Sequence, residues 1–235
     1  MLSCGGRIHR QAAEGDDITI LTVCAGGLSV EDLSPFAESL HRRWGTAVSA
    51  VERRREEDRE AVAALGARAM HMEFQDAIYR TGGEGVALYA SEEAIFGPVH
   101  RFEYELIERV AQALREATPA EAEVIVPLGA GGHVDHRLTR RAAERLPQRL
   151  VYYEDFPYAA DYGEVEYALA GADWESETVP ISEPDFRSKV DAVALYRSQI
   201  STFWSHLEEM RTALREFALK TGGHGTLAER YWRMR

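Results

Sequence analysis

The sequence predicts an α/β fold, with a Rossmann-like, mainly parallel sheet and helices on both of its faces. The first observation behind this prediction is that short apolar runs alternate with amphipathic segments as far as about residue 155. The second is that residues 123–128 form a continuous apolar run that a glycine-rich turn ends. The third is an ordinary globular composition, with 45% hydrophobic and 28% charged residues among 235. We therefore expect residues 1–235 to form one domain.

The elements of the first half are predicted from hydrophobic periodicity and from glycine and proline breaks. Ile8 and Ala12 recur at helical spacing before Gly15, which is typical of a helix and its end. The charged run 53–60 is interpreted as the solvated face of a helix with i to i+4 ion pairs. In chain order we expect a helix between Gly5 and Gly15, a strand at 17–24, a helix start at 34–36, a helix at 51–65, a strand at 66–72 and a glycine-bearing loop at 82–85.

The second half continues the alternation of strands and helices and then changes character. In chain order we expect a helix from Pro98 to about 116, a strand at 123–128, a helix at 133–146, a strand at 150–153, an extended segment at 164–181, and helices at 184–199 and 203–219. There is no internal repeat or low-complexity linker that would mark a domain boundary.

Charge and composition exclude several classes of partner. The formal net charge of -12 disfavours nucleic acid and anionic membrane surfaces, because both require a positive protein surface. No apolar run approaches the roughly 18 to 20 residues that span a bilayer, and the start does not resemble a signal peptide. Cys4 and Cys24 show no disulfide or metal-site spacing. We expect a cytoplasmic protein that acts on a neutral or cationic small molecule.

The chemistry concentrates in the turn and helix start at residues 127–136. Ligands of open parallel sheets gather outside the carboxyl ends of the strands, which is where His133 and His136 lie. Three residues apart at a helix start, both can face one side, and the helix dipole opposes protonation of imidazole, which leaves the form that binds metal. Asp135 could hydrogen-bond a nearby histidine and fix its tautomer. Capping of the helix is the alternative role for these residues.

At this point the sequence resembles the LmbE-like, or PIG-L, family of zinc-dependent N-deacetylases. The Gly-His-x-Asp-His element carries most of the resemblance, and other segments support it. The matching segments are Leu2 to Gly6, Asp76 to Arg80, Pro127 to His136, Tyr153 to Tyr158, Tyr196 to Gln199 and Ala228 to Arg233. The resemblance implies a hydrolase that removes the N-acetyl group from an amino-sugar derivative such as an N-acetylglucosamine conjugate.

The resemblance also implies a role for each matching residue. The family's zinc is held by two histidines and one aspartate, and His136 matches one of these ligands. His133 would polarise the carbonyl or stabilise the oxyanion, and Asp135 would orient a histidine. Asp76 and Arg80 would recognise substrate hydroxyls. Zinc lowers the pKa of its bound water to about 7 and acts as a Lewis acid on the amide carbonyl.

The family's remaining site residues lie in a His-Pro-Asp-Asp-Glu stretch that this sequence does not match. In relatives the stretch precedes the position of Leu2, so we expect a deacetylase domain truncated at its N-terminus, without the first strand of its sheet and without two of the three zinc ligands. Such a chain is expected to have little activity and to be only marginally stable. Association with a second copy, as a homo-oligomer, is one way to compensate.

Two other functions stay open. The first is a non-catalytic sugar-binding or structural protein that has lost the metal site. The second is a nucleotide-binding α/β domain, although the glycines near residues 5 and 130 lack the Gly-x-Gly-x-x-Gly spacing.

Overall fold

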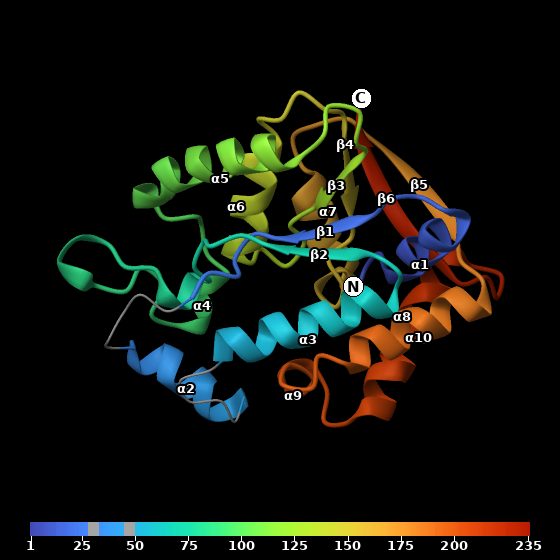
Figure 1. Ribbon diagram of the computed structural model, residues 1–235, viewed down its shortest axis with the longest axis horizontal. Helices are drawn as coiled ribbons and strands as arrows, with labels where there is room; N and C mark the ends of the chain where they lie inside the picture. Colours follow the sequence, from blue (N-terminus) through green and yellow to red (C-terminus); the bar gives the residue numbers. More distant parts are fainter. Residues whose placement is uncertain (28–32, 45–49) are drawn as a thin grey trace. The chain divides into compact units, whose positions relative to one another are not determined.

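The computed structural model describes residues 1–27, 33–44 and 50–235 (Figure 1). The chain divides into two compact units. Unit 1 consists of Met1–Ser29, Glu38–Glu73 and Thr178–Arg230, and unit 2 of Val30–Ala37, Phe74–Glu177 and Tyr231–Arg235. Three elements run from one unit into the other along the chain, namely α2 (Pro35–Trp44), β5 (Trp174–Pro180) and β6 (Ala228–Met234). The expectation of one domain stays a prediction.

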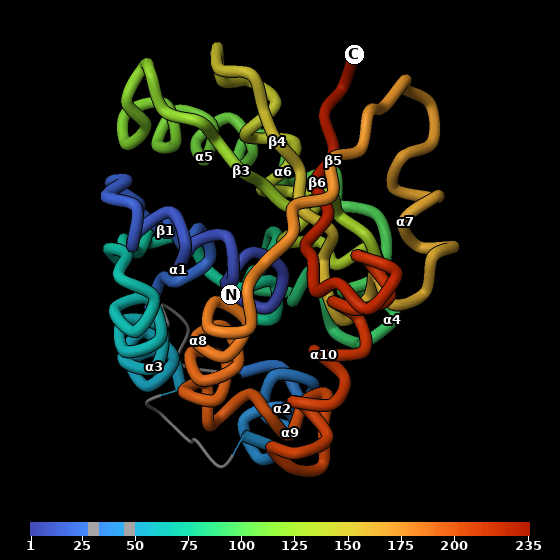
Figure 2. The backbone as a smooth tube through the Cα atoms, turned by 90° about the vertical axis from the view of Figure 1, so that its right-hand side faces the viewer, coloured from blue at the N-terminus to red at the C-terminus, as the bar shows by residue number. Residues whose placement is uncertain are grey.

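Unit 1 combines a two-stranded parallel sheet with a group of helices. Its elements are α1 (Gly5–Glu14), β1 (Thr19–Thr22), α3 (Ala50–Ala64), β2 (Arg68–His71), α8 (Glu183–Ala194), α9 (Ile200–Phe203) and α10 (Leu207–Gly222). Ile20 of β1 pairs with Ala69 of β2 in parallel register. Helices α3 and α8 lie side by side (Figure 2), and Ala61, Leu65 and Ala192 form a buried apolar cluster there.

Helix α1 is anchored in unit 1 by a buried carboxylate at its first turn. Glu229 accepts hydrogen bonds from the backbone N–H groups of Gly6 and Arg7 at 2.9 and 3.0 Å, and Lys189 Nζ lies 2.8 Å from the same carboxylate. An anion is favourable at a helix N-terminus, where backbone N–H groups have no helical partner. A Cβ atom at Gly5 would stand 2.8 Å from the Lys189 side chain, so glycine is required for this close approach.

Helix α3 corrects the prediction that its charged run is a solvated face. Glu57 is 4% exposed and accepts hydrogen bonds from the backbone and side chain of Ser198 at 2.9 and 2.6 Å. The neighbouring Asp58 carboxylate is bound by His71 and by the hydroxyl of Tyr196. The charge pattern of the helix alone predicts that these carboxylates are exposed. It does so because it cannot show their partners, which lie outside the helix in the sequence.

Unit 2 is built around the sheet order β3-β4-β6-β5. Its other elements are the short 3-10 helices η1 (Ala77–Tyr79), η2 (Gly83–Gly85), η3 (Arg101–Glu103) and η4 (Tyr158–Ala160), the strands β3 (Val124–Pro127) and β4 (Leu150–Tyr153), and the helices α4 (Glu92–Ile95), α5 (Tyr104–Ala117), α6 (Val134–Ala143) and α7 (Tyr162–Leu169). Strands β3 and β4 are parallel, whereas β4 and β6 are antiparallel, with Tyr152 opposite Trp232. Helices α5 and α6 pack side by side (Figure 1).

The predicted α/β class is confirmed, and the Rossmann-like description is broadly consistent with helices combined with mixed sheets. The β1–β2 and β3–β4 pairs are parallel as expected, whereas β6 makes the larger sheet mixed. None of the helices among the described residues is long and apolar enough to cross a membrane.

Two predicted segments were wrong. Residues 164–181 are not extended throughout, because α7 occupies Tyr162–Leu169 before β5 begins. Asp161 caps this helix by accepting a hydrogen bond from Gly163 N–H at 2.9 Å, and Val165 is fully buried. The helix expected from Pro98 starts later, with η3 and then α5, because the His100 side chain caps the N–H of Phe102 at 3.3 Å.

Candidate active site

The site lies in unit 2, where the carboxyl ends of β3 and β4 meet. Leu128, directly after β3, donates its N–H to the carbonyl of Tyr153 at 3.0 Å and so extends the parallel pairing. The next two backbone N–H groups, of Gly129 and Ala130, donate to Asp155 Oδ2 at 2.7 and 3.0 Å. Asp155 follows β4 and is 1% exposed. Its carboxylate therefore ties the glycine-rich turn to the end of the neighbouring strand.

Two glycines of the turn are required by what packs against them. Gly131 has φ +78°, and a Cβ atom there would stand 2.4 Å from the Tyr158 side chain. Gly132 has φ +74°, and a Cβ atom there would stand 2.8 Å from Arg137 Nη2 and 3.3 Å from the carbonyl oxygen of Phe96. Both positions need a left-handed backbone and close approach, which only glycine combines without strain. The turn thus leaves room for Tyr158 and Phe96 to pack near the start of α6.

His136 is held in one orientation by Asp155. Its Nδ1 atom lies 2.6 Å from Asp155 Oδ1. Because a carboxylate accepts, this contact assigns the proton to Nδ1 and leaves a lone pair on Nε2. Burial lowers the pKa of His136, but the hydrogen bond and charge of Asp155, together with Asp135, outweigh it and the pKa is raised. The side chain remains 36% exposed, so the ring is not fully enclosed by the protein.

His133 is held in the opposite tautomer. Its Nδ1 atom accepts the backbone N–H of Asp135 at 3.2 Å, so the proton of the neutral ring is on Nε2. Burial lowers the pKa of His133, and although the charge of Asp135 opposes this, the net direction is downward. The ring is therefore a neutral donor through Nε2. The dipole at a helix start is expected to lower the pKa of both histidines. The pKa of His133 is lowered as expected, whereas the pKa of His136 is raised.

The resemblance implies that Asp135 orients a histidine, but its carboxylate contacts other groups. Its carboxylate accepts from Arg80 Nη1 at 2.6 Å and from the N–H of Ala77 at 3.2 Å, and it is Asp155 that contacts a histidine ring through its carboxylate. Burial raises the pKa of Asp135, but the positive charge of Arg80 and the hydrogen bonds that Ala77 and Arg80 donate outweigh it and the pKa is lowered. Asp135 acts on His133 through its backbone N–H and its charge.

Arg80, for which the resemblance implies a role in substrate contact, is buried. Its residue exposure is 5%, and its guanidinium lies between two carboxylates, those of Asp135 and Glu103. Glu103 is itself 2% exposed and accepts from the Tyr89 hydroxyl at 2.5 Å. A guanidinium enclosed in this way organises Asp135 and has little surface to offer a substrate.

Asp76 begins η1 and stays accessible. Its Oδ1 atom accepts from the N–H of Ile78 at 3.2 Å, which is the cap of that short helix. Its negative charge acts to raise the pKa of His133, so the two side chains lie close enough to interact. The structure therefore brings together His133, Asp135, His136, Asp76 and Arg80, all five residues predicted from the sequence.

Sequence reasoning missed Asp155 as a member of the site. The signal was present, because Glu154 and Asp155 directly follow a strand predicted to be parallel to the one before the glycine turn, and carboxyl ends of such strands share one edge. Two further titratable residues, His71 in β2 and Glu73 just after it, are not part of this site. They lie in unit 1, where His71 Nε2 contacts Asp58 at 2.7 Å and Glu73 pairs with Arg55.

The described side chains at the site supply one ligand for a metal ion. Across residues 1–27, 33–44 and 50–235, no three His, Cys, Asp or Glu side chains are grouped so as to hold a metal ion. His136 has the orientation, the free Nε2 atom and the supporting carboxylate that a histidine ligand needs. These described residues therefore prepare one ligand and do not complete a coordination shell.

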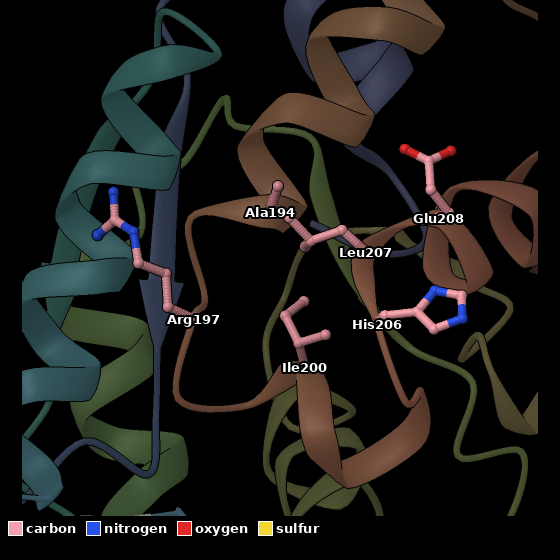
Figure 3. Close-up of a pocket in the computed structure, with 6 residues that line it drawn as sticks. All are labelled: Ala194, Arg197, Ile200, His206, Leu207 and Glu208. Atoms are coloured by element: carbon pink, nitrogen blue, oxygen red, sulfur yellow. The ribbon is translucent and has the colours of Figure 1, made fainter.

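Unit 1 contains a separate open pocket of about 650 Å³ (Figure 3). It is lined by Ala194, Arg197, Ile200, His206, Leu207 and Glu208. The charged side chains that line it form ion pairs, Arg197 with Glu60 and Glu208 with Arg211. His206 caps α10 by accepting from the N–H of Glu209 at 3.2 Å. The pocket has the volume of a ligand site but no group prepared for catalysis.

Fold and site together define an α/β protein with a carboxylate-supported histidine at the carboxyl ends of parallel strands. The family model described as GlcNAc-PI de-N-acetylase, PIG-L, matches residues 1–146. The chain belongs to the PIG-L family.

Several proteins that the chain resembles are named as deacetylases. The 2'-N-acetylparomamine deacetylase of Streptomyces fradiae is 32% identical over 213 residues, which is 84% of this chain and 68% of the relative. The zinc-inhibited form of a teicoplanin deacetylase is 27% identical, with a TM-score of 0.84, and the match covers 100% of this chain and 93% of that one. The A40926 pseudoaglycone deacetylase is 28% identical, with a TM-score of 0.75 and coverage of 100% and 91%. An N,N'-diacetylchitobiose deacetylase from Pyrococcus horikoshii, 19% identical with a TM-score of 0.56 and coverage of 100% and 78%, shares the fold.

Proposed function

We propose that this protein is a zinc-dependent hydrolase that removes the N-acetyl group from an amino-sugar derivative. The observation that carries the proposal is the pair of oppositely oriented histidines at the start of α6, in which Asp155 holds His136 and the backbone of Asp135 holds His133. Support comes from similar proteins, which include a 2'-N-acetylparomamine deacetylase and a teicoplanin deacetylase. Cys4 and Cys24, which form no disulfide, are in keeping with a reducing cytoplasm as its location.

His136 would hold zinc through Nε2, the nitrogen that its contact with Asp155 leaves unprotonated. When bound, zinc supplies Lewis acidity at the amide carbonyl and a more acidic water molecule. Within the described residues we assign no general base and no further ligand.

His133 would act on the amide directly. Its Nε2–H is a neutral donor in the conformation that Asp135 imposes, and such a donor stabilises the negative charge that develops on the carbonyl oxygen. In the reaction, water adds to the carbonyl carbon, the carbon–nitrogen bond breaks, and a proton passes to the amine that leaves. Acetate and the free amino sugar are the products.

The two remaining residues would serve recognition and positioning. Asp76, accessible at the start of η1, is proposed to accept a hydrogen bond from a substrate hydroxyl. Arg80 is proposed to hold Asp135 in place, since its guanidinium is enclosed by Asp135 and Glu103.

A second candidate is a sugar-binding protein without catalysis. It is favoured by one observation, that no three-residue metal group exists among residues 1–27, 33–44 and 50–235. Binding of an amino sugar without its hydrolysis, at the site that contains Asp76, is what this alternative predicts.

The two functions are separated by measuring zinc content and acetate release on the protein expressed from its gene. With the two further zinc ligands that the family resemblance implies, we expect about one zinc per chain and acetate release from N-acetylglucosamine conjugates, both lost in His136→Ala and both kept in His206→Ala, a histidine that caps α10 in unit 1. Sugar binding without zinc or acetate release would reject the hydrolase in favour of the binding protein.

A further inference from the structure

Four aromatic rings form a closed cycle at the candidate site. Phe96 packs edge-on against His133 with ring centroids 5.5 Å apart, and His133 lies 5.5 Å from His136. His136 lies 6.3 Å from Tyr158, and Tyr158 lies 5.6 Å from Phe96. The two histidines that the proposed reaction uses are therefore bordered by two rings that it does not use. We refer to Phe96 and Tyr158 as the aromatic wall.

The wall is held in place from several sides. Tyr158 can lie against the turn only because Gly131 has no side chain, since a Cβ atom there would stand 2.4 Å from the tyrosine. Phe96 is held through the next residue, because Arg137 of α6 donates to the carbonyl of Gly97 at 2.9 Å. The absence of a side chain at Gly132 leaves room for Arg137 and for the carbonyl of Phe96. The turn that positions the histidines thus also positions the wall.

His133 has both ionisable and apolar neighbours. The ionisable residues that act on its pKa are Asp135, His136, Asp76 and Arg80. The ring of Phe96 is the apolar neighbour, and Tyr158 continues that apolar surface toward His136. Burial, with the charges of Asp155 and Glu92, raises the pKa of Tyr158 to about 12, so its ring carries no charge at neutral pH. Both wall residues are partly exposed and can contact a ligand.

An acylated amino sugar has two parts that match these two kinds of neighbour. The sugar carries hydroxyl groups, which need polar partners such as Asp76, whereas the acyl group beyond the carbonyl is purely apolar. An amide whose oxygen accepts from His133 Nε2 holds its acyl carbon within a few bond lengths of that ring. We propose that the aromatic wall contacts the acyl group of the substrate and limits its length. This inference rests on the proposed deacetylase function.

The test compares N-acetyl-, N-butanoyl- and N-hexanoylglucosamine as substrates and detects the glucosamine that is released from each. The variants are Phe96→Ala and Tyr158→Ala, with Phe96→Leu and Tyr158→Phe as milder changes. Phe102→Ala is the matched control, because Phe102 is 59% exposed and lies outside the ring cycle. Circular dichroism checks that each variant is folded.

The alanine variants are expected to raise the ratio of kcat/KM for the hexanoyl over the acetyl substrate by about tenfold or more, since one methylene in a pocket typically changes selectivity by 10-fold to 200-fold. Phe96→Leu should change the ratio in the same direction by less. Phe102→Ala and Tyr158→Phe, which retains the ring, should keep the original ratio.

Three results have separate meanings. If the unaltered protein releases glucosamine from none of the substrates, the proposed function fails. If it is active but folded Phe96 and Tyr158 variants keep its acyl selectivity, the role of the wall is rejected. If these variants change only the preference between N-acetylglucosamine and N-acetylgalactosamine, the wall contacts the sugar and the acyl assignment is overturned.

Discussion

Nδ1 of His136 lies 2.6 Å from Oδ1 of Asp155, and the other oxygen of the same carboxylate accepts the N–H groups of Gly129 and Ala130. One side chain therefore fixes both the histidine and the turn that precedes it. Oδ1 contacts the histidine and Oδ2 accepts from the turn, so a substitution of Asp155 tests both contacts.

Asp155→Asn should weaken zinc binding by about 10-fold to 100-fold, because an amide supports the metal-binding tautomer of His136 less well than a carboxylate does. Competitive titration against a chromophoric chelator measures the change. Asp161→Asn is the control, since Asp161 caps α7 and asparagine is an equally good cap. Equal zinc affinity in the Asp155 and Asp161 variants would show that Asp155 has no influence on the metal ligand.

Arg80→Met should lower the free energy of unfolding by about 3–5 kcal/mol, because it leaves the buried carboxylates of Asp135 and Glu103 without their cation. Urea unfolding followed by circular dichroism gives the value. Arg197→Met, which removes an exposed pair with Glu60, should cost less than about 1 kcal/mol. A similar small loss at Arg80 would contradict the arrangement in which both carboxylates depend on it.

Gly131→Ala should destabilise the protein by roughly 1–3 kcal/mol, because alanine at φ +78° is strained and its Cβ atom would overlap Tyr158. Combining it with Tyr158→Gly, which removes both the Cβ and the Cγ atom that the new methyl group would meet at 2.4 Å, should recover the steric part, so that the two substitutions are not additive in urea unfolding. Gly171→Ala provides the comparison, since Gly171 has φ +88° but nothing within 4 Å. Strict additivity of the Gly131 and Tyr158 changes would argue against their contact.

Three tyrosines of unit 2 should titrate late in alkaline solution. Burial is the main cause that raises the pKa of Tyr89, Tyr152 and Tyr158 to about 12 from an ordinary value of 10.0. A group whose folded pKa is raised contributes stability that is fully present below its unfolded pKa and is lost as pH rises through its folded pKa. Stability should therefore fall between about pH 10 and 12.

Phenolate absorbance during a pH titration tests this expectation. The ten tyrosines should titrate in more than one step, with the late step accompanied by loss of ellipticity. Tyr89→Phe should remove one group from the late step and leave the early step unchanged. A single step near pH 10 in the folded protein would contradict the burial of these hydroxyl groups.

Local spacing was enough to predict the elements that carry the site. The apolar run at 123–128, the glycine-rich turn and the histidines three residues apart are encoded within fourteen consecutive residues, so β3, the turn and α6 follow from sequence. Helix α7 was missed because Val165 is the only buried residue among Tyr162–Leu169, so the segment has no apolar stripe at helical spacing. The antiparallel strand β6 was missed because its partner, β4, lies far from it in the chain.

What the sequence by itself determined about this protein is its α/β class, the strand–turn–helix unit and the candidate residues His133, Asp135 and His136. Tertiary structure alone decided which groups surround them: Asp155 on His136, Arg80 and Glu103 behind Asp135, and Phe96 and Tyr158 beside the rings. The physical reason is that hydrogen bonds and ring contacts depend on distance in space, and parallel pairing of β3 with β4 brings together side chains that no local pattern relates.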